Sequence, residues 1–375
     1  MGGFRRRSGD GLPVPPSRRG ADMEAPDVMA TERRRKWIVT GGAGFIGCHA
    51  ASRFHRAGDL VVVVDNLSRR GADENLAWLR SQGVEDFVKL DVRDARGLHD
   101  LLSTHADADA VLHLAGQVAV TTSVVDPRTD FEINALGTLN VLEAVRLGAK
   151  AKPAVLYSST NKVYGHLGHI RVVERDGRYA YEDHPFGVDE AEPLDFHSPY
   201  GCSKGCGDQY VIDYARIYGL KTVAFRQSCI YGTRQFGIED QGWIAWFCLA
   251  ATRGQKFTIF GDGKQIRDTL WVEDLLDAYE AALDRIEDVK GQVFNVGGGP
   301  SNTLSLLELV ATLERHFGRA MDPAFADWRP GDQPVFVADV RKAGRLLGWS
   351  PQVATADGVA RLLAWIGENR GLFTV

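Results

Sequence analysis

The chain has 375 residues, of which 44% are hydrophobic and 25% are charged, and its formal net charge at pH 7 is −5. This composition is that of an ordinary globular protein, and the length predicts a large core that divides into two lobes. The most apolar stretch, residues 60–64, ends at Asp65. It is far short of the roughly 18 apolar residues that cross a bilayer, so we expect no membrane partner.

Residues 1–35 differ from the rest of the chain, because arginines are set among Gly, Pro and Ser with almost no apolar periodicity. This composition predicts a disordered basic tail. Its arginine run lacks the apolar stretch that an export signal requires. A solvated extension, or a start at Met23 or Met29, explains the tail better than a nucleic-acid contact. We therefore expect no nucleic-acid partner.

The segment after the tail predicts a strand that runs into a glycine turn. Residues 37–40 are apolar, and the string GGAGFIG that follows opens a predicted helix over residues 45–56. Gly41 permits the tight turn, Gly44 lets the backbone approach a pyrophosphate, and Gly47 lets the helix pack close to the strand. The helix N-terminus offers free N–H donors to phosphates. A dinucleotide site is predicted, and a purely structural glycine loop is the weaker alternative.

The segments that follow alternate as a doubly wound sheet requires. The expected elements are strands at residues 60–64, 87–90, 110–114 and 154–157, and a long helix at residues 129–147. The predicted fold class is α/β, a Rossmann-type, mostly parallel sheet with a smaller C-terminal α/β lobe that binds the substrate. After Tyr231 the elements shorten. We expect a cofactor domain at residues 36–230 and a mainly substrate-binding lobe at residues 231–375.

The end of the second predicted strand indicates which dinucleotide binds. Asp65 lies a little over twenty residues past the glycine turn, where a carboxylate accepts hydrogen bonds from ribose hydroxyls and repels a 2′-phosphate. This favours NAD over NADP, although Arg69 and Arg70 nearby argue mildly for NADP. Asp91 and Val92 follow the third strand, where flanking an adenine and forming a surface turn are equally consistent with the spacing.

A tyrosine and a lysine four residues apart carry the predicted chemistry. Ser198 and a following proline predict a helix start, and the helix continues to residue 218, so Tyr200 and Lys204 share one face. A phenol has an ordinary pKa of about 10, so a base near neutrality needs roughly 4 kcal/mol of preferential phenolate stabilisation. The Lys204 ammonium and a cationic nicotinamide could supply it, with Thr160 hydrogen-bonded to the reacting oxygen. An exposed helix pair is the alternative.

The remaining reactive side chains predict no further chemistry. His113 lies within an apolar strand and is expected to be a core histidine. Four further histidines show no metal-ligand spacing, so we predict no metal site: they are His166, His169, His184 and His197. The scattered cysteines match neither a disulfide framework nor paired ligands, which favours a reducing cytoplasm: they are Cys48, Cys202, Cys206, Cys229 and Cys248.

Several long strings carry a resemblance. TGGAGFIG, HLAG, SST followed by VYG, and SPYGCSK resemble the extended short-chain dehydrogenase/reductase superfamily of nucleotide-sugar epimerases and dehydratases, over nearly everything after residue 35. HLAGQVAVTTS, YSSTNKVYG, LDFHSPYGCSKGCGDQY and DQGWIAWF most resemble the epimerases that act at C2 of CDP-linked sugars. The resemblance implies a cytoplasmic enzyme that binds NAD and a CDP-linked nucleotide sugar. A homodimer or homotetramer would use helices 129–147 and 200–218.

The resemblance also implies which residues form the site. The catalytic triad falls on Thr160, Tyr200 and Lys204, of which the last two also contact the cofactor. The other implied NAD contacts are Gly41, Gly44, Phe45, Ile46, Gly47, Asp65, Asn66, Ser68, Arg69, Asp91, Val92, Leu114, Ala115, Gly116, Asn134 and Ser158. The implied substrate contacts are Gln117, Thr122, Thr160, Asn161, Arg234, Gln235, Gln241, Arg267 and Arg329.

Some of these assignments have alternatives. Without the resemblance, Arg267 and Arg329 would read as surface ion pairs with Asp268 and Asp332. Trp243 and an aromatic residue three positions later suit either a sugar pocket or the core.

Departures from the family pattern narrow the reaction. Members that dehydrate or decarboxylate sugars usually carry an acidic residue one or two positions after the threonine, where this chain has Asn161 and Lys162. Cys229 stands where many members have asparagine, which leaves one substrate contact open. We expect transient oxidation at C2 to a 2-keto sugar and hydride return to the opposite face. Action at C4, another substrate such as CDP-glucose or a UDP-sugar, or a non-catalytic NAD sensor are the alternatives.

Overall fold

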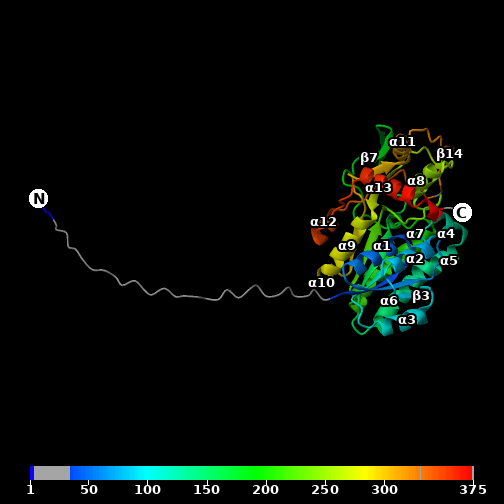
Figure 1. Cartoon of the computed structure of the whole chain (residues 1–375). Coiled ribbons are helices and arrows are strands. Elements are labelled where there is room, and N and C mark those ends of the chain that lie inside the picture. Colours follow the sequence, from blue (N-terminus) through cyan, green and yellow to red (C-terminus); the bar gives the residue numbers. More distant parts are fainter. Residues whose placement is uncertain (4–33, 330, 374–375) are drawn as a thin grey trace. The chain divides into compact units, whose positions relative to one another are not determined.

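The computed structural model describes residues 1–3, 34–329 and 331–373. The chain divides into two units, Met1–Arg33 and Arg34–Val375, and every element named below belongs to the second (Figure 1). The predicted disorder of the tail falls almost entirely on residues outside those described.

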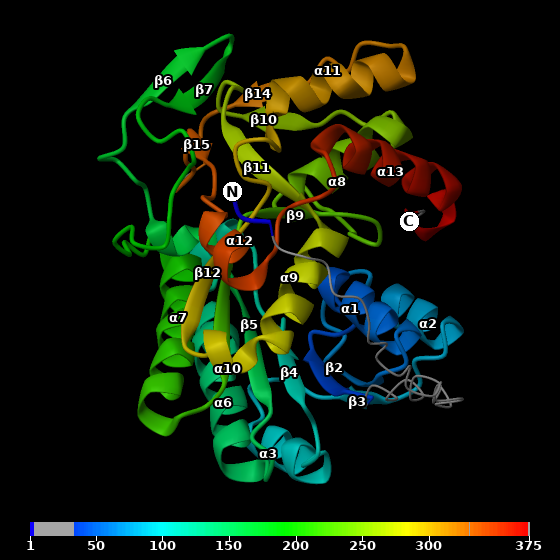
Figure 2. The ribbon, with the colours of Figure 1, turned by 90° about the vertical axis from the view of Figure 1, so that its left-hand side faces the viewer.

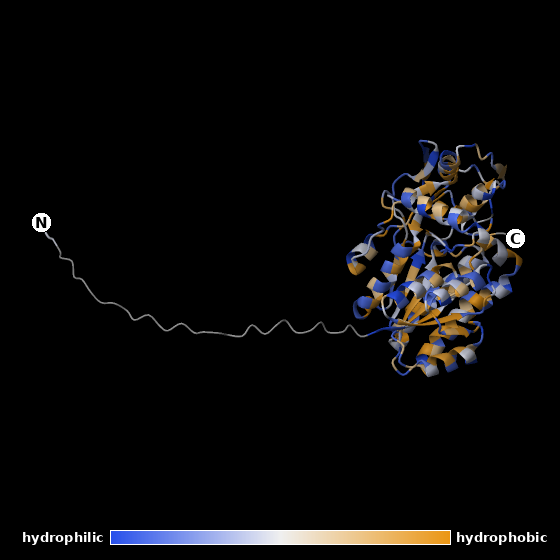
Figure 3. Cartoon of the chain, viewed as in Figure 1, coloured by the Kyte–Doolittle hydropathy of each residue, from blue (hydrophilic) through white to orange (hydrophobic). Residues whose placement is uncertain are grey.

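A seven-stranded sheet forms the centre of the second unit, and all of its neighbouring strands are parallel. In spatial order the strands are β12 (Gln292–Val296), β8 (Thr222–Gln227), β5 (Ala154–Thr160), β4 (Ala110–His113), β1 (Lys36–Thr40), β2 (Leu60–Asp65) and β3 (Phe87–Lys89). Figure 3 shows these strands in the orange of apolar residues. Strands covered on both faces need apolar side chains at nearly every position, which explains the short apolar runs.

Helices cover both faces of this sheet. Trp37 and Val39 point into one core cluster and Ile38 into the other, as the period of two along a strand requires. The Ile38 face is covered by α3 (Ala95–Thr104), α6 (Gly137–Gly148) and α7 (Ser198–Tyr218). The Trp37 face is covered by α1 (Phe45–Arg56), α9 (Val272–Asp284), α10 (Ile286–Val289) and α12 (Arg341–Leu347), and α2 (Ala72–Ser81) packs on α1 (Figure 2).

Smaller sheets lie beyond the carboxyl ends of the central strands. The four-stranded sheet contains β9 (Cys229–Tyr231), β11 (Ile266–Trp271), β13 (Thr303–Ser305) and β15 (Val335–Phe336). Two-stranded sheets are formed by β10 (Thr258–Phe260) with β14 (Ala324–Ala326), and by β6 (Val172–Arg175) with β7 (Arg178–Tyr181). Apolar residues of the four-stranded sheet and of β10 pack on α8 (Trp243–Arg253), α11 (Leu306–Phe317) and α13 (Thr355–Glu368). Those of β6 and β7 pack instead with residues of β11 and β15.

The remaining helical turns connect these layers. They are α4 (Val120–Val125), α5 (Pro127–Phe131), the π-helix η1 (Glu132–Leu136) and the 3-10 helices η2 (Asn161–Tyr164) and η3 (Arg370–Phe373). The predicted helix at residues 129–147 is therefore three consecutive segments that begin at Pro127. A π-turn widens the middle one, which the apolar pattern could not reveal.

The strand ends differ slightly from the prediction. β5 continues past Tyr157 to Thr160, because Ser158, Ser159 and Thr160 pair with residues 225–227 of β8. The strand was predicted from its apolar residues, so the polar residues at its end were not recognised as part of it. β3 and β4 each end one residue earlier than predicted, and β2 includes Asp65. These shifts leave the predicted fold class intact.

The architecture confirms the predicted Rossmann-type parallel sheet and the smaller α/β lobe. Strand β12 lies downstream of residue 231 and yet forms an edge of the central sheet. The two predicted segments, residues 36–230 and 231–375, therefore do not correspond to separate sheets. That they bind NAD and the substrate, respectively, stays a prediction. In the part of the chain that the structure describes, every helix is too short or too polar to span a membrane.

Candidate active site

The glycine turn forms a backbone cradle. Gly41 has φ of +69°, and a Cβ on it would lie 2.7 Å from the backbone N of Ala115. A Cβ on Gly47 would lie 2.2 Å from the Gly41 carbonyl oxygen, and one on Gly44 would lie 3.0 Å from the same atom. No described side chain caps α1. Its first-turn N–H groups thus face a cavity with room for phosphates, which fits a dinucleotide.

Asp65 lies at the carboxyl end of β2, beside this cradle. Its carboxylate accepts hydrogen bonds from the backbone N–H groups of Ala43 at 3.0 Å and Leu67 at 2.8 Å. Burial raises its pKa, while those N–H groups and Arg69 act to lower it. The carboxylate is therefore held by the backbone in a fixed position, where the sequence places a ribose contact.

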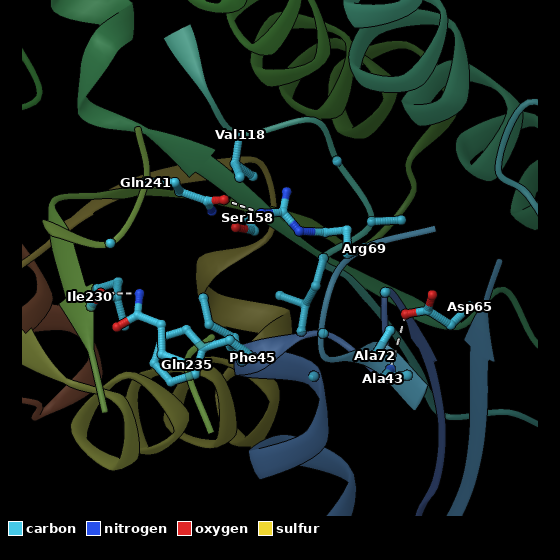
Figure 4. Close-up of a pocket in the computed structure, with 18 of the residues that line it drawn as sticks. Ala43, Phe45, Asp65, Arg69, Ala72, Val118, Ser158, Ile230, Gln235 and Gln241 are labelled. Carbon is cyan, nitrogen blue, oxygen red and sulfur yellow. Dashed lines mark hydrogen bonds between the residues drawn. The ribbon is translucent and has the colours of Figure 1, made fainter. Parts of the chain in front are cut away.

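The glycine-turn cavity is the cavity around this cradle (Figure 4). Most of the predicted NAD contacts line it: Gly41, Gly44, Phe45, Ile46, Gly47, Asp65, Asn66, Ser68, Arg69, Asp91, Val92, Leu114, Ala115, Gly116, Ser158, Tyr200 and Lys204. Asn66 donates a hydrogen bond to Asp91 at 2.8 Å, which ties the ends of β2 and β3 together. Arg69 reaches across the cavity to Gln241, as the dashed line in Figure 4 shows.

The triad residues come from two neighbouring elements. Thr160 ends β5, and Tyr200 lies in the first turn of α7, where Ser198 has φ of +64° and its hydroxyl accepts the N–H of Gly201 at 3.2 Å. This is the predicted serine cap, although the helix bounds place Ser198 inside α7. The Tyr200 N–H donates to the Ser123 hydroxyl at 3.1 Å, which fixes the start of the helix.

Lys204 lies one turn further along α7 and points back toward β5. Its ammonium donates to the carbonyl oxygen of Ser158 and lies 4.3 Å from the ring centroid of Tyr157. The lysine is 4% exposed and Tyr200 is 8% exposed. Both groups are thus largely withdrawn from water and line the glycine-turn cavity, and Thr160 lines it with them.

The protein groups alone do not produce the expected phenolate. Burial raises the pKa of Tyr200 to about 12, although the Thr160 hydroxyl and the charge of Arg69 act to lower it. Burial also lowers the pKa of Lys204 to about 7, against the charge of Asp208. The sequence predicts that the Lys204 ammonium and a cationic nicotinamide together stabilise the phenolate, and this stays a prediction for the protein with NAD bound. Loss of hydration outweighs the nearby charges.

A second cavity adjoins the first, and we call it the arginine cavity. Both cavities share part of their lining, namely Val118, Thr160, Tyr200, Cys229, Gln241, Gly242 and Trp243. The predicted substrate contacts Asn161, Arg267 and Arg329 line only the arginine cavity. Thr160 and Tyr200 therefore stand where the two cavities meet.

The two arginines have carboxylate partners. Arg267 pairs with Asp332, while Asp268 is turned to Ser228 and the Gly299 N–H. Arg329 pairs with Asp240 at 3.0 Å. Its guanidinium also lies 3.8 Å from the ring centroid of Phe260. The ion pairs hold both planar donor groups at the wall of the cavity, which suits a phosphate ligand.

Other predicted contacts lie elsewhere. Arg234 and Gln235 line the glycine-turn cavity, and the Arg234 guanidinium lies 4.0 Å from the ring centroid of Trp78. Gln117, Thr122 and Asn134 lie outside the described lining of both cavities.

The side chains of two of these residues hold the fold together. The Gln117 amide donates to the Ala119 carbonyl at 2.7 Å and to Asp130 at 3.0 Å. The Asn134 amide nitrogen donates to the carbonyl of Gln117 at 3.0 Å and to the Ser203 hydroxyl at 3.1 Å. Because Asn134 lies in the π-turn, it ties the chain after β4 to α7. Through these hydrogen bonds, Gln117 and Asn134 hold together segments that adjoin the cavities, without lining either cavity themselves.

The structure also adds residues that the sequence did not single out as contacts. The buried Thr121 hydroxyl lines the arginine cavity and has no hydrogen-bond partner among the described residues. It lies one position before the predicted Thr122, because α4 begins at Val120 and turns Thr121 to the cavity. Lys162 lines the same cavity. In so short a helix as α4, the apolar pattern could not predict which residues face the cavity.

The structure places three aromatic side chains whose roles the sequence left open. Trp243 lines both cavities and donates to the Cys229 sulfur at 3.1 Å, whereas Trp246 packs in the second lobe. His113 is a core histidine, with its ring nitrogens 2.7 Å from the Thr40 hydroxyl and 3.1 Å from the Thr138 hydroxyl. Within the described ranges, no cluster of three or more His, Cys, Asp or Glu could hold a metal.

The chain is similar to known proteins in both sequence and structure. The family model of the NAD dependent epimerase/dehydratase family matches residues 37–297. A CDP-paratose 2-epimerase from Salmonella typhi is 48% identical over 335 residues, which are 88% of this chain and 98% of that protein. The UDP-glucose 4-epimerase of Thermotoga maritima, solved with UDP-glucose, is 31% identical with a TM-score of 0.76, over 89% of this chain and 99% of that one.

The UDP-glucose 4-epimerase of Thermus thermophilus, solved in complex with NAD, is 30% identical with a TM-score of 0.74, over 89% of this chain and 99% of that one. The chain therefore belongs to the NAD dependent epimerase/dehydratase family, which confirms the family, the enzyme class and the cofactor NAD that the sequence predicts.

Proposed function

We propose that the chain inverts C2 of a CDP-linked deoxysugar, as in the conversion of CDP-paratose to CDP-tyvelose. The observation that carries the proposal is the position of Thr160 and Tyr200 where the glycine-turn cavity meets the arginine cavity. The 48% identity to a CDP-paratose 2-epimerase over nearly its whole length supports the choice of substrate and carbon.

In this proposal Tyr200 removes the proton of the C2 hydroxyl and later returns it. The residues that line the glycine-turn cavity would hold NAD, which would supply a hydride acceptor and donor for C2 and a positive charge at its nicotinamide ring. Because the pKa of Tyr200 is about 12, a phenolate at neutral pH needs roughly 7 kcal/mol of stabilisation, at about 1.4 kcal/mol for each pH unit. Lys204 in its charged form contributes to this, and Thr160 orients the reacting oxygen.

Inversion requires the 2-keto sugar to present its other face. The substrate would be held mainly at its diphosphate by Arg267 and Arg329, which line the arginine cavity. The sugar itself is then free to turn between the two hydride transfers. This arrangement gives no net oxidation, which is what an epimerase needs.

Elimination is disfavoured by the residues after Thr160. Asn161 and Lys162 line the arginine cavity, and neither can act as the carboxylic acid that a dehydratase of this family usually carries there. The substituted positions therefore support epimerisation over loss of water.

The substrate and carbon are tested by product analysis. Purified protein is incubated with CDP-paratose, CDP-glucose or UDP-glucose, and NMR shows which carbon inverts. We expect inversion at C2 of CDP-paratose. Inversion at C4, or preference for the UDP-sugar, would replace the proposal with the corresponding alternative. If the protein binds NAD but turns over none of these substrates, it would instead be a non-catalytic NAD sensor.

The role of Tyr200 is tested by Tyr200→Phe, which removes one oxygen from a side chain that is 8% exposed. We expect turnover to fall by about 100- to 10,000-fold, the range for loss of a general acid–base group. Tyr210→Phe, on the same helix but 42% exposed, is the matched control and should turn over like the wild type. Normal turnover by Tyr200→Phe would exclude Tyr200 as the base.

We also propose a cytoplasmic homodimer or homotetramer with residues 36–230 binding NAD and residues 231–375 mainly binding the sugar nucleotide. The free cysteines support a reducing compartment. Exposed apolar side chains at Val125, Phe131 and Ile217, on α4, α5 and α7, support assembly through these helices. Light scattering on the purified protein measures the oligomeric state, and a monomer would contradict the assembly.

A further inference from the structure

Lys162 connects the proposed catalytic segment to the arginine cavity. It lies in η2, directly after the strand that ends at Thr160, and its backbone N–H donates to the Thr160 hydroxyl at 3.2 Å. Its side chain lines the arginine cavity together with Arg267 and Arg329. One short turn therefore carries both the hydroxyl that orients the sugar and a cation at the wall of the substrate cavity.

The charge of Lys162 is the least neutralised of the three cations. Arg267 pairs with Asp332 and Arg329 with Asp240. Among the residues that the structure describes, the Lys162 ammonium donates to the Gly331 carbonyl at 3.3 Å and to the Gln333 side-chain oxygen at 3.4 Å.

Among the described residues no carboxylate lies within ion-pair distance of Lys162. Burial lowers its pKa to about 8, the charge of Arg267 acts in the same direction, and the charge of Asp332, the partner of Arg267, acts to raise it. The group is still mostly an ammonium at neutral pH, with long hydrogen bonds to neutral oxygens. An anion in the cavity would therefore gain more from Lys162 than from either paired arginine.

Lys162 also lies close to the proposed base through the backbone. A Cβ on Gly201 would lie 3.3 Å from the Lys162 carbonyl oxygen, so the first turn of α7, which carries Tyr200, packs directly on the Lys162 backbone. A phosphate bound by Lys162 is thus kept on a segment that touches both Thr160 and the Tyr200 turn.

We propose that Lys162 binds the β-phosphate of the nucleoside diphosphate sugar and thereby brings C2, rather than C4, to Tyr200. In such a sugar only the glycosidic oxygen and C1 separate the phosphorus from C2, whereas C4 lies across the ring. A phosphate anchor on the turn that packs against the first turn of α7 would select the near carbon. This inference rests on the proposed function and assigns the choice of carbon to a residue outside the triad.

The test compares ligands that differ by one phosphate. The NAD-loaded protein is titrated calorimetrically with CDP and with CMP, using wild type, Lys162→Met and Lys162→Arg. We expect Lys162→Met to weaken CDP binding by about 10- to 100-fold and CMP binding by less than threefold, the range for one charged hydrogen bond. Lys162→Arg should recover part of the CDP affinity, and exposed Lys256→Met is the control.

Kinetics with CDP-paratose give the second measurement. Lys162→Met should raise KM about 10- to 100-fold and produce some inversion at a carbon other than C2. Unchanged CDP affinity, or equal loss for CDP and CMP, would overturn the role of Lys162. Absence of wild-type epimerisation would instead refute the proposed function, since the CDP and CMP titrations do not depend on turnover. Melting curves with retained NAD show that Lys162→Met is folded.

Discussion

Gly47→Ala tests the backbone cradle most directly. Gly47 lies in the first turn of α1, and an added Cβ would lie 2.2 Å from the Gly41 carbonyl oxygen and 2.6 Å from the Gly42 Cα. Both atoms belong to the backbone of the glycine turn, so no flexible side chain can give way. The turn and helix must separate by roughly 1 Å to restore ordinary contact distances.

The size of the effect follows from two opposing contributions. Alanine is favoured over glycine within a helix by about 1 kcal/mol, whereas overpacking of a rigid site destabilises by about 1–3 kcal/mol or more. Since backbone atoms clash here, we take the upper end, which leaves a net loss of about 2 kcal/mol of unfolding free energy. The displaced turn should also weaken NAD binding by at least about tenfold, because phosphate binding depends on N–H geometry at this helix end.

Gly367→Ala is the matched control. Gly367 is also in a helix, α13, and an added Cβ there would meet nothing within 4 Å. It should be neutral or slightly stabilising. Urea unfolding gives the free energies, and fluorescence titration with NAD gives the affinities. A Gly47→Ala protein that unfolds like the wild type and binds NAD as tightly would refute the close packing of the cradle and its role in binding.

Two further predictions concern buried charges. Asp268 accepts hydrogen bonds from Ser228 and the Gly299 N–H, and burial raises its pKa to about 6. Between about pH 4 and pH 6 the folded state holds a proton that the unfolded state has lost, so wild-type stability should fall by up to about 3 kcal/mol relative to Asp268→Asn as pH rises; parallel stability curves would contradict this. The buried ion pair of Arg226 with Asp208 measures 2.9 Å. Arg226→Met should lower the unfolding free energy by about 3–5 kcal/mol by leaving Asp208 unpaired, and adding Asp208→Asn should recover part of it, whereas additive losses would speak against coupling.

Local patterns predicted the cofactor half of the fold well. The helix at residues 45–56 matches α1, because the glycine turn marks its start and the apolar periodicity marks its length. The end of β5 was missed because Ser158, Ser159 and Thr160 are polar and extend the strand only by pairing with β8. Pairing with a strand that is distant in the sequence cannot be predicted from local hydrophobicity.

Site residues that belong to sequence motifs could be predicted. Residues whose orientation depends on the exact start of a short helix or turn could not. Tyr200 and Lys204 were found from their spacing and share one wall of the cavity. Gln117 and Thr122 were placed from resemblance, and the structure turns both away from the described lining of the cavities. The π-turn and the short helix α4 determine which side chains face the cavity there. Neither element has a sequence pattern from which it could be predicted.

The turn after β5 offers one reason why related proteins can differ in reaction while sharing a fold. The Thr160 hydroxyl accepts the N–H of Lys162 at 3.2 Å, a backbone contact that any residue except proline at position 162 can make. The side chains of Asn161 and Lys162 remain free to vary, and both line the arginine cavity. A carboxylic acid there would provide a proton for elimination, whereas an ammonium provides an anchor for phosphate. A change at this turn can therefore alter the chemistry and the carbon that reacts while the proton-transfer residues stay in place.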